Sequence, residues 1–200
     1  MWSNARFCPV CAAELVTAEV YGRTRRRCSS CTFVLYANPA GAAGAVVVDA
    51  DRRVLLVRRG IEPFRGQWAL PAGYQEADES PVRAAEREVE EETGVRVRTV
   101  ALLDLVFVPD DPRKPANVAL FLAVPRSGLA AEGRDDALAA EWFHIDALPA
   151  PLAFESTGAV LDRLKAESDE ARVWWNRWRR GLDAANEPPS ERPSEPPPGR

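Results

Sequence analysis

Five glutamates lie between residues 86 and 92. In a helix, at about 100° per residue, Glu88, Glu91 and Glu92 share one side, and the other two point elsewhere. Like charges at this spacing repel, and they lie at the helix end that disfavours anions, so a compensating cation is needed. Carboxylate oxygens suit Mg2+ or Mn2+, which complete their shells with water and substrate phosphates. The pattern therefore indicates a metal site for a phosphate ester or anhydride, with a solvated acidic face as the alternative.

The residues around these glutamates form a longer motif. From residue 73 to 95 they resemble the Nudix box, Gly-x5-Glu-x7-Arg-Glu-U-x-Glu-Glu-x-Gly-U, in which U is a bulky aliphatic residue. Segments 66–73 and 141–143 resemble the family's approach to the box and its late strand, so the similarity covers residues 42 to about 165. All specified positions of the box match, namely Gly73, Glu79, Arg87, Glu88, Val89, Glu91, Glu92, Gly94 and Val95.

This resemblance implies a fold and a reaction. The family fold is an α/β/α sandwich with a mixed sheet, and its members hydrolyse a nucleoside diphosphate linked to another moiety, X. In the matching positions, Glu88, Glu91 and Glu92 would ligate Mg2+ or Mn2+, and the Gly73 carbonyl would complete the metal site.

The resemblance also implies roles for three further residues. Arg87 and Glu79 would form a structural pair that ties a loop to the helix. A loop carboxylate placed six residues before Trp142 would be Asp136, with Asp135 as its rival and a solvated acidic loop as the alternative. The catalytic candidates are Glu88, Glu91, Glu92 and Asp136, of which all but Glu92 are candidates for the general base.

All four cysteines lie in the first 31 residues, as two Cys-x-x-Cys pairs separated by sixteen residues. This spacing is typical of a zinc ribbon, in which four thiolates leave no open position and Zn2+ is structural. Two disulfides or four free thiols are the alternatives. The hairpin between the pairs is basic, from Arg23 to Arg27, but a charge run on such a ribbon is usually solvated, so nucleic-acid binding is less favoured. The predicted zinc ligands are Cys8, Cys11, Cys28 and Cys31.

Two groups of Nudix proteins carry such a ribbon before the hydrolase domain. NADH pyrophosphatases, which also act on NAD-capped RNA, have a Ser-Gln-Pro-Trp-Pro-Phe-Pro-x-Ser array after the box, and residues 97–115 lack it. A shorter branch with FAD and ADP-ribose pyrophosphatases shares segments 58–63, 66–76 and 152–154. The resemblance to this branch therefore implies cleavage of FAD or ADP-ribose into AMP and a second monophosphate. The alternatives are an NADH or NAD-cap pyrophosphatase, and a nucleotide-sensing regulator or nucleic-acid-binding protein that uses the ribbon.

The elements that must position these residues are strands and three helices. The central helix is expected to begin after Ser80, with Pro81 in its first turn, and to end at Gly94. Further helices are expected at 155–164 and 170–180, and strands at 45–49, 54–58, 95–108, 117–124 and 141–145. The expected domains are a zinc ribbon (1–36), a linker (37–41), a Nudix domain with a C-terminal helix (42–182) and a disordered Pro-rich tail (183–200).

Composition restricts the partners. The chain has 200 residues and a net charge of −4, which gives no overall affinity for polyanions. Its apolar runs are too short to span a bilayer, and its N-terminus lacks a secretory segment. We therefore expect a cytoplasmic protein with a small-molecule nucleotide substrate, no membrane partner and no favoured nucleic-acid partner, with a homodimer left open. The Trp- and Arg-rich helix at 170–180 is expected to pack in the core or a dimer rather than to face RNA or a membrane.

Overall fold

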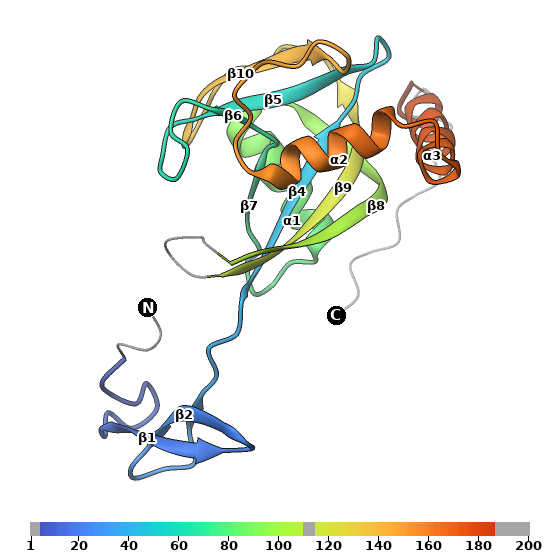
Figure 1. Cartoon of the computed structure of the whole chain (residues 1–200). Helices are drawn as coiled ribbons and strands as arrows, with labels where there is room; N and C mark the ends of the chain where they lie inside the picture. The colour runs from blue at the N-terminus through green and yellow to red at the C-terminus, as the bar shows by residue number, and fades with distance from the viewer. Residues whose placement is uncertain (1–4, 110–114, 187–200) are drawn as a thin grey trace.

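The structure is a computed structural model that describes residues 5–109 and 115–186. Its N-terminal part is a three-stranded antiparallel sheet of β1 (Leu15–Val20), β2 (Arg23–Cys28) and β3 (Val34–Leu35), set apart from the larger body (Figure 1). The predicted hairpin is formed by β1 and β2. Its two turn residues, Tyr21 and Gly22, have positive φ angles of 51° and 69°, as a two-residue hairpin of this twist requires.

The larger body contains two sheets, one with strand order β7-β4-β9-β8 and one with order β10-β5-β6. Strands β4 and β9 are parallel, and all other pairs are antiparallel, so the sheet is mixed as expected. The strands are β4 (Ala40–Val47), β5 (Arg53–Arg59), β6 (Trp68–Ala69), β7 (Ala72–Tyr74), β8 (Arg96–Val108), β9 (Ala116–Ser127) and β10 (Ala137–His144).

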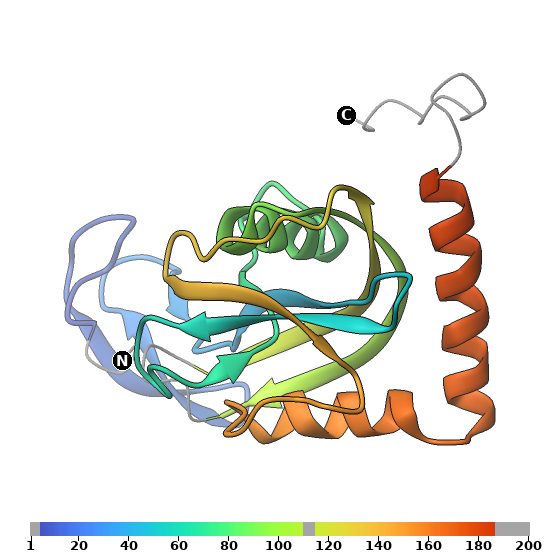
Figure 2. The same cartoon turned by 90° about the horizontal axis from the view of Figure 1, so that it is seen from above.

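In the described part of the chain, three helices cover the strands: α1 (Pro81–Thr93), α2 (Glu155–Lys165) and α3 (Asp169–Asn186). Helices α1 and α2 lie on opposite sides of the strands, and α3 stands at one end, roughly across the direction of α2 (Figure 2). The layers therefore form the α/β/α sandwich that the sequence predicts. Among the described residues, none of the helices has the length and apolar character needed to cross a bilayer.

Helix α1 has the ends that local signals predict. The Ser80 hydroxyl accepts a hydrogen bond from the backbone N–H of Arg83 at 3.3 Å, and Pro81 occupies the first turn. At the other end, Gly94 adopts a left-handed conformation with φ of 71° and donates its N–H to the Glu90 carbonyl. These caps fix the bounds of α1 and therefore the positions of the box glutamates within the helix.

Helix α3 packs its tryptophans into the core. Trp174 and Trp178 are buried, and the indole N–H of Trp178 donates to the Val48 carbonyl at 3.0 Å. Trp175 donates its indole N–H to the Leu164 carbonyl of α2. The Trp-rich face of α3 therefore packs against the chain's own core.

Two of the expected domain boundaries differ from the elements of the structure. Ala40 and Gly41, expected in the linker, already belong to β4, where they pair with Ala116 and Asn117 of β9. The Gly and Pro content of 37–41 suggested a break, but the ladder with a distant strand overrides that local preference. Residues 183–186, expected in the disordered tail, extend α3, and the rest of that tail lies outside the described residues.

Candidate active site and cysteine cluster

Two glutamates of α1 are buried against the short strand β7. A Cβ at Gly73 would overlap the carboxylate of Glu88, so the backbone reaches this carboxylate only because residue 73 is glycine. The backbone N–H of Ala72 donates to the Glu92 carboxylate at 3.2 Å. Strand β7 therefore forms one wall of the site, and the side of α1 that carries Glu88 and Glu92 forms the other.

The site brings several acidic groups together. Burial, together with the charges of Asp136 and Glu88, raises the pKa of the Glu92 carboxyl to about 9. Burial also raises the pKa of the Glu88 carboxyl, and this effect exceeds the lowering caused by the hydrogen bond from Arg87. Asp136 reaches the cluster from the loop before β10, and its carbonyl is fixed by the N–H of Gly60 at 2.7 Å. Asp136 is therefore close enough to Glu88 and Glu92 for its charge to raise the pKa of both carboxyls.

Glu91 is held differently from its two neighbours on the helix. Its side chain is half exposed, and its carboxylate accepts a hydrogen bond from Nη1 of Arg87 at 2.7 Å. The same nitrogen donates to Glu88 at 2.7 Å. In the part of the chain that the structure describes, the four cysteines are the one group of acidic, His or Cys side chains whose ligand atoms converge as around a metal ion. The oxygens of Glu88, Glu91 and Glu92 do not converge in this way.

Arg87 ties the loop before α1 to the helix. Its Nε and Nη2 donate to the two carboxylate oxygens of Glu79 at 3.1 and 2.6 Å, and Nη2 also donates to the Tyr74 carbonyl. The guanidinium holds the pKa of the Glu79 carboxyl below its usual range. This is the geometry of the structural pair that the resemblance implies.

A pocket adjoins the carboxylates, and the sequence did not identify it. It shares Ala72 and Gly73 of β7 with the site described above. Its other walls come from β8, β9 and the start of α2, together with Ala42 of β4 and Arg59 of β5. The side chains that line it include Arg59, Tyr74, Val106, Val108, Val118, Phe154, Ser156 and Thr157. Arg59 and Phe154 could have been found from the sequence, because both fall in segments that resemble the FAD and ADP-ribose branch. No motif marks the valines.

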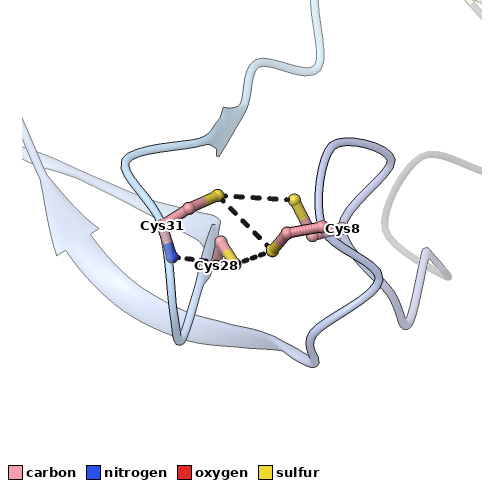
Figure 3. Close-up of side chains that lie close together, drawn as sticks. Cys8, Cys28 and Cys31 are labelled. Atoms are coloured by element: carbon pink, nitrogen blue, oxygen red, sulfur yellow. Dashed lines mark hydrogen bonds between the residues drawn. The ribbon is translucent and has the colours of Figure 1, made fainter.

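The four cysteines of the ribbon converge on one point. The Sγ atoms of Cys11 and Cys28 are 3.4 Å apart, and those of Cys8 and Cys31 are 3.7 Å apart. Figure 3 shows the labelled Cys8, Cys28 and Cys31 pointing toward one another. These separations exceed a disulfide bond and approach the edge of about 3.8 Å that a tetrahedral zinc–thiolate site has with Zn–S bonds of 2.3 Å. The Ser30 backbone N–H helps lower the pKa of the Cys28 thiol to about 6, whereas hydrogen bonds with Cys28 raise the pKa of Cys31 to about 12 and also raise that of Cys11.

Comparison with known proteins supports the assignment. The family model of the NUDIX domain matches residues 38–164. The chain therefore belongs to the Nudix family and is a Nudix pyrophosphohydrolase, which confirms the prediction from residues 73–95.

Several relatives show how far the similarity extends. The chain is 36% identical over 134 residues to an ADP-ribose pyrophosphatase of Methanocaldococcus jannaschii. The aligned region covers 66% of this chain and 78% of that protein. It is 32% identical over 145 residues to the NAD-capped RNA hydrolase NudC of Chromobacterium violaceum, covering 72% of this chain and 52% of that one. The crystal structure of a NUDIX hydrolase from Nitrosomonas europaea superposes with a TM-score of 0.71 at 29% identity, over 80% of this chain and 90% of the other.

Proposed function

We propose that this Nudix hydrolase cleaves the diphosphate of ADP-ribose or FAD, giving AMP and a second monophosphate. The observation that carries the proposal is the shared wall: the carboxylate cluster and the apolar pocket meet at Ala72 and Gly73. A diphosphate beside the carboxylates would place an attached ring in the pocket. The similarity to an ADP-ribose pyrophosphatase supports the choice of substrate.

The residues of the cluster fit a divalent cation. Glu92 is buried beside two like charges, and the hard oxygen donors of the cluster suit Mg2+ or Mn2+. The proposed holders are Glu88, Glu91 and Glu92 with the Gly73 carbonyl, and Glu91 must leave Arg87 to join them. A bound dication supplies charge neutralisation at the phosphates and lowers the pKa of a water molecule.

The chain's own groups would then position the reactants and accept a proton. Arg87 donates hydrogen bonds to Glu88 and Glu91 and so fixes the orientation of both carboxylates. Asp136 offers a third carboxylate, from a loop anchored to β5 through Gly60. Each of the three is a candidate for the general base that takes the proton of the attacking water.

Substrate choice is tested by comparing specificity constants. We expect kcat/KM for ADP-ribose or FAD to exceed that for NADH by about tenfold or more, because residues 97–115 lack the array of the NADH-directed branch. Tenfold corresponds to about 1.4 kcal/mol of transition-state binding, which one stacking contact can supply. The measurement is chromatographic product analysis with Mg2+ or Mn2+, with AMP as the expected common product. If NADH has the highest specificity constant of the three, the proposed substrate is wrong.

A second candidate function has one observation in its favour. The similarity to an NAD-capped RNA hydrolase spans 145 residues, a longer stretch than the match to the ADP-ribose pyrophosphatase. The identity is lower, at 32% against 36%. NAD-capped RNA therefore belongs in the same substrate panel, where its preferential hydrolysis would favour this alternative.

We also propose that the four cysteines bind one structural Zn2+. Cys8 and Cys28 are buried in the small core of the ribbon together with Leu15. This core is small for an independent fold, and metal binding contributes folding free energy directly to such units. The ribbon has four thiolates and no open coordination position, so the role of the ion would be structural.

Replacing Cys28 with serine is expected to release this zinc. Elemental analysis of protein purified without chelators should give one zinc per wild-type chain and at least about tenfold less for Cys28→Ser. The neighbouring, exposed Ser29 supplies a control, since Ser29→Ala keeps all four thiols. Hydrogen exchange should also speed up across residues 5–36 in the cysteine variant. Wild-type protein without zinc, or with a disulfide between the cysteine pairs, would rule the site out.

A further inference from the structure

We infer that the pocket beside the carboxylates is the subsite for the adenine ring of the substrate, with Phe154 as its aromatic contact and Arg59 as the contact to the adjoining phosphate. The inference rests on the proposed function and specifies which end of the substrate enters the pocket. It also assigns substrate-binding roles to two residues outside the Nudix box.

The walls of the pocket suit a flat, weakly polar ring. Val106 and Val108 of β8 face into it together with Val118 of β9. The next residue on the same strand, Phe107, is 56% exposed and does not line the pocket. A sugar or a phosphate placed among these valines would lose its hydration without a hydrogen-bonding partner, whereas a purine buries its faces at little cost. The ring end of the nucleotide is therefore the part that fits.

The pocket also has the few polar groups that orient a ring. Ser156 and Thr157, in the first turn of α2, contribute to its lining. Tyr74, at the end of β7, also lines the pocket. A mainly apolar pocket with a small number of hydroxyl groups is the usual form of a site that recognises a heteroaromatic ring by its edge.

Phe154 and Arg59 lie together at the pocket. The Arg59 guanidinium is 5.0 Å from the centroid of the Phe154 ring, and its Nε donates to the Pro63 carbonyl at 2.8 Å. The same guanidinium is close enough to Glu92 to oppose the rise in the pKa of that carboxyl. Arg59 therefore lies between the ring pocket and the carboxylates, where the phosphate next to the adenosine would pass.

The test uses reaction products, so that binding is measured without turnover. Calorimetry with the full chain and Mg2+ should show AMP binding about tenfold or more tightly than ribose 5-phosphate, because only AMP carries the ring. Phe154→Leu should weaken AMP binding about tenfold, as expected for loss of a stacking contact, and leave ribose 5-phosphate unchanged. Phe154→Tyr should restore AMP binding, since it keeps the aromatic ring.

The matched control is Phe107→Leu, the same substitution on the hairpin at a position outside the pocket lining. Phe154 also packs edge-on against Phe64, so Phe154→Leu could loosen the fold. A measurement on the wild-type protein avoids that problem: bound AMP should give nuclear Overhauser contacts from adenine H2 and H8 to the methyl groups of Val106, Val108 and Val118.

The outcomes separate this inference from the proposed reaction. Equal affinities for AMP and ribose 5-phosphate, or adenine contacts elsewhere on the protein, overturn the adenine subsite. A similar loss of AMP binding in Phe107→Leu also contradicts it. AMP binding through Phe154 in a protein that cleaves neither ADP-ribose nor FAD supports the subsite and refutes the proposed substrates.

Discussion

Replacing Glu92 with glutamine is expected to lower kcat by about a hundredfold or more, equivalent to about 2.7 kcal/mol of transition-state stabilisation. The substitution preserves the shape of a buried side chain and an oxygen that can accept the Ala72 N–H. It removes one negative charge from the cluster that would hold the divalent cation. Steady-state rates with ADP-ribose and with FAD, at saturating Mg2+ or Mn2+, are the measurement.

The control is Glu90→Gln, two residues earlier on the same helix. Glu90 is exposed and pairs with Arg96 at 2.8 Å, a surface ion pair that contributes little. This variant should retain the wild-type rate. Near wild-type turnover in Glu92→Gln, or full wild-type activity in excess EDTA, would refute a metal-dependent mechanism at this cluster.

The same variant has an opposite effect on stability. A carboxyl whose pKa is about 9 in the folded protein and about 4.3 in the unfolded chain favours the folded state in its protonated form. Stability of the metal-free protein should therefore fall as the pH rises between these values. Glu92→Gln cannot ionise, so its Tm in EDTA should exceed that of the wild type at pH 8 and depend less on pH.

The central helix and its glutamates could be predicted because their signals are local. Ser80, Pro81 and Gly94 set the ends of α1 within a few residues of the chain. The i, i+4 spacing placed Glu88 and Glu92 on one buried side. The side-chain position of Glu91 could not be predicted from this spacing, because Arg87 lies between the Glu91 carboxylate and those of Glu88 and Glu92. Hydrogen bonds of that kind depend on rotamers, which helical periodicity does not specify.

The pocket could not be predicted, because it depends on register between distant segments. Strand β8 has irregularities in its pairing with β9, including one between Leu102 and Asp104. Each irregularity changes which residues face the core, so Asp104 reaches Arg163 of α2 and Leu105 is exposed. Simple alternation along residues 96–108 would assign the inward face incorrectly. The proximity of Asp136 to the glutamates is likewise set by the pairing of β5 with β10.

The cysteine cluster is less predictable from the sequence than helix α1 but more predictable than the pocket. Each Cys-x-x-Cys pair forms a local turn, and the sixteen residues between the pairs are enough for a hairpin that brings the pairs together. The sequence therefore predicts that the thiols converge without long-range information. The sequence does not predict the contacts of Arg25 and Arg26 within the ribbon. In the structure, Arg26 donates to the Leu15 carbonyl and Arg25 stacks on the Tyr36 ring.

Replacing Arg87 with methionine is expected to destabilise the fold by about 3 kcal/mol at pH 7. The change leaves the mostly buried carboxylates of Glu79 and Glu88, which are 15% and 11% exposed, without their cationic partner. Breaking a buried pair by removing one partner typically costs about 3–5 kcal/mol, and the 30% exposure of Arg87 places this case at the low end. Urea or thermal unfolding of the metal-free protein gives the value.

The control is Arg83→Met, one turn earlier on α1, where the side chain is exposed. Because Arg87 lowers the pKa of Glu79, the stabilisation from that pair is complete above the unfolded pKa of about 4.3 and is lost as the pH falls through the lower folded value. The difference between Arg87→Met and wild type should therefore shrink in acid, and Arg87→Lys should recover part of it at pH 7. A loss in Arg87→Met no larger than in Arg83→Met would mean that Arg87 does not hold the loop before α1 to the helix.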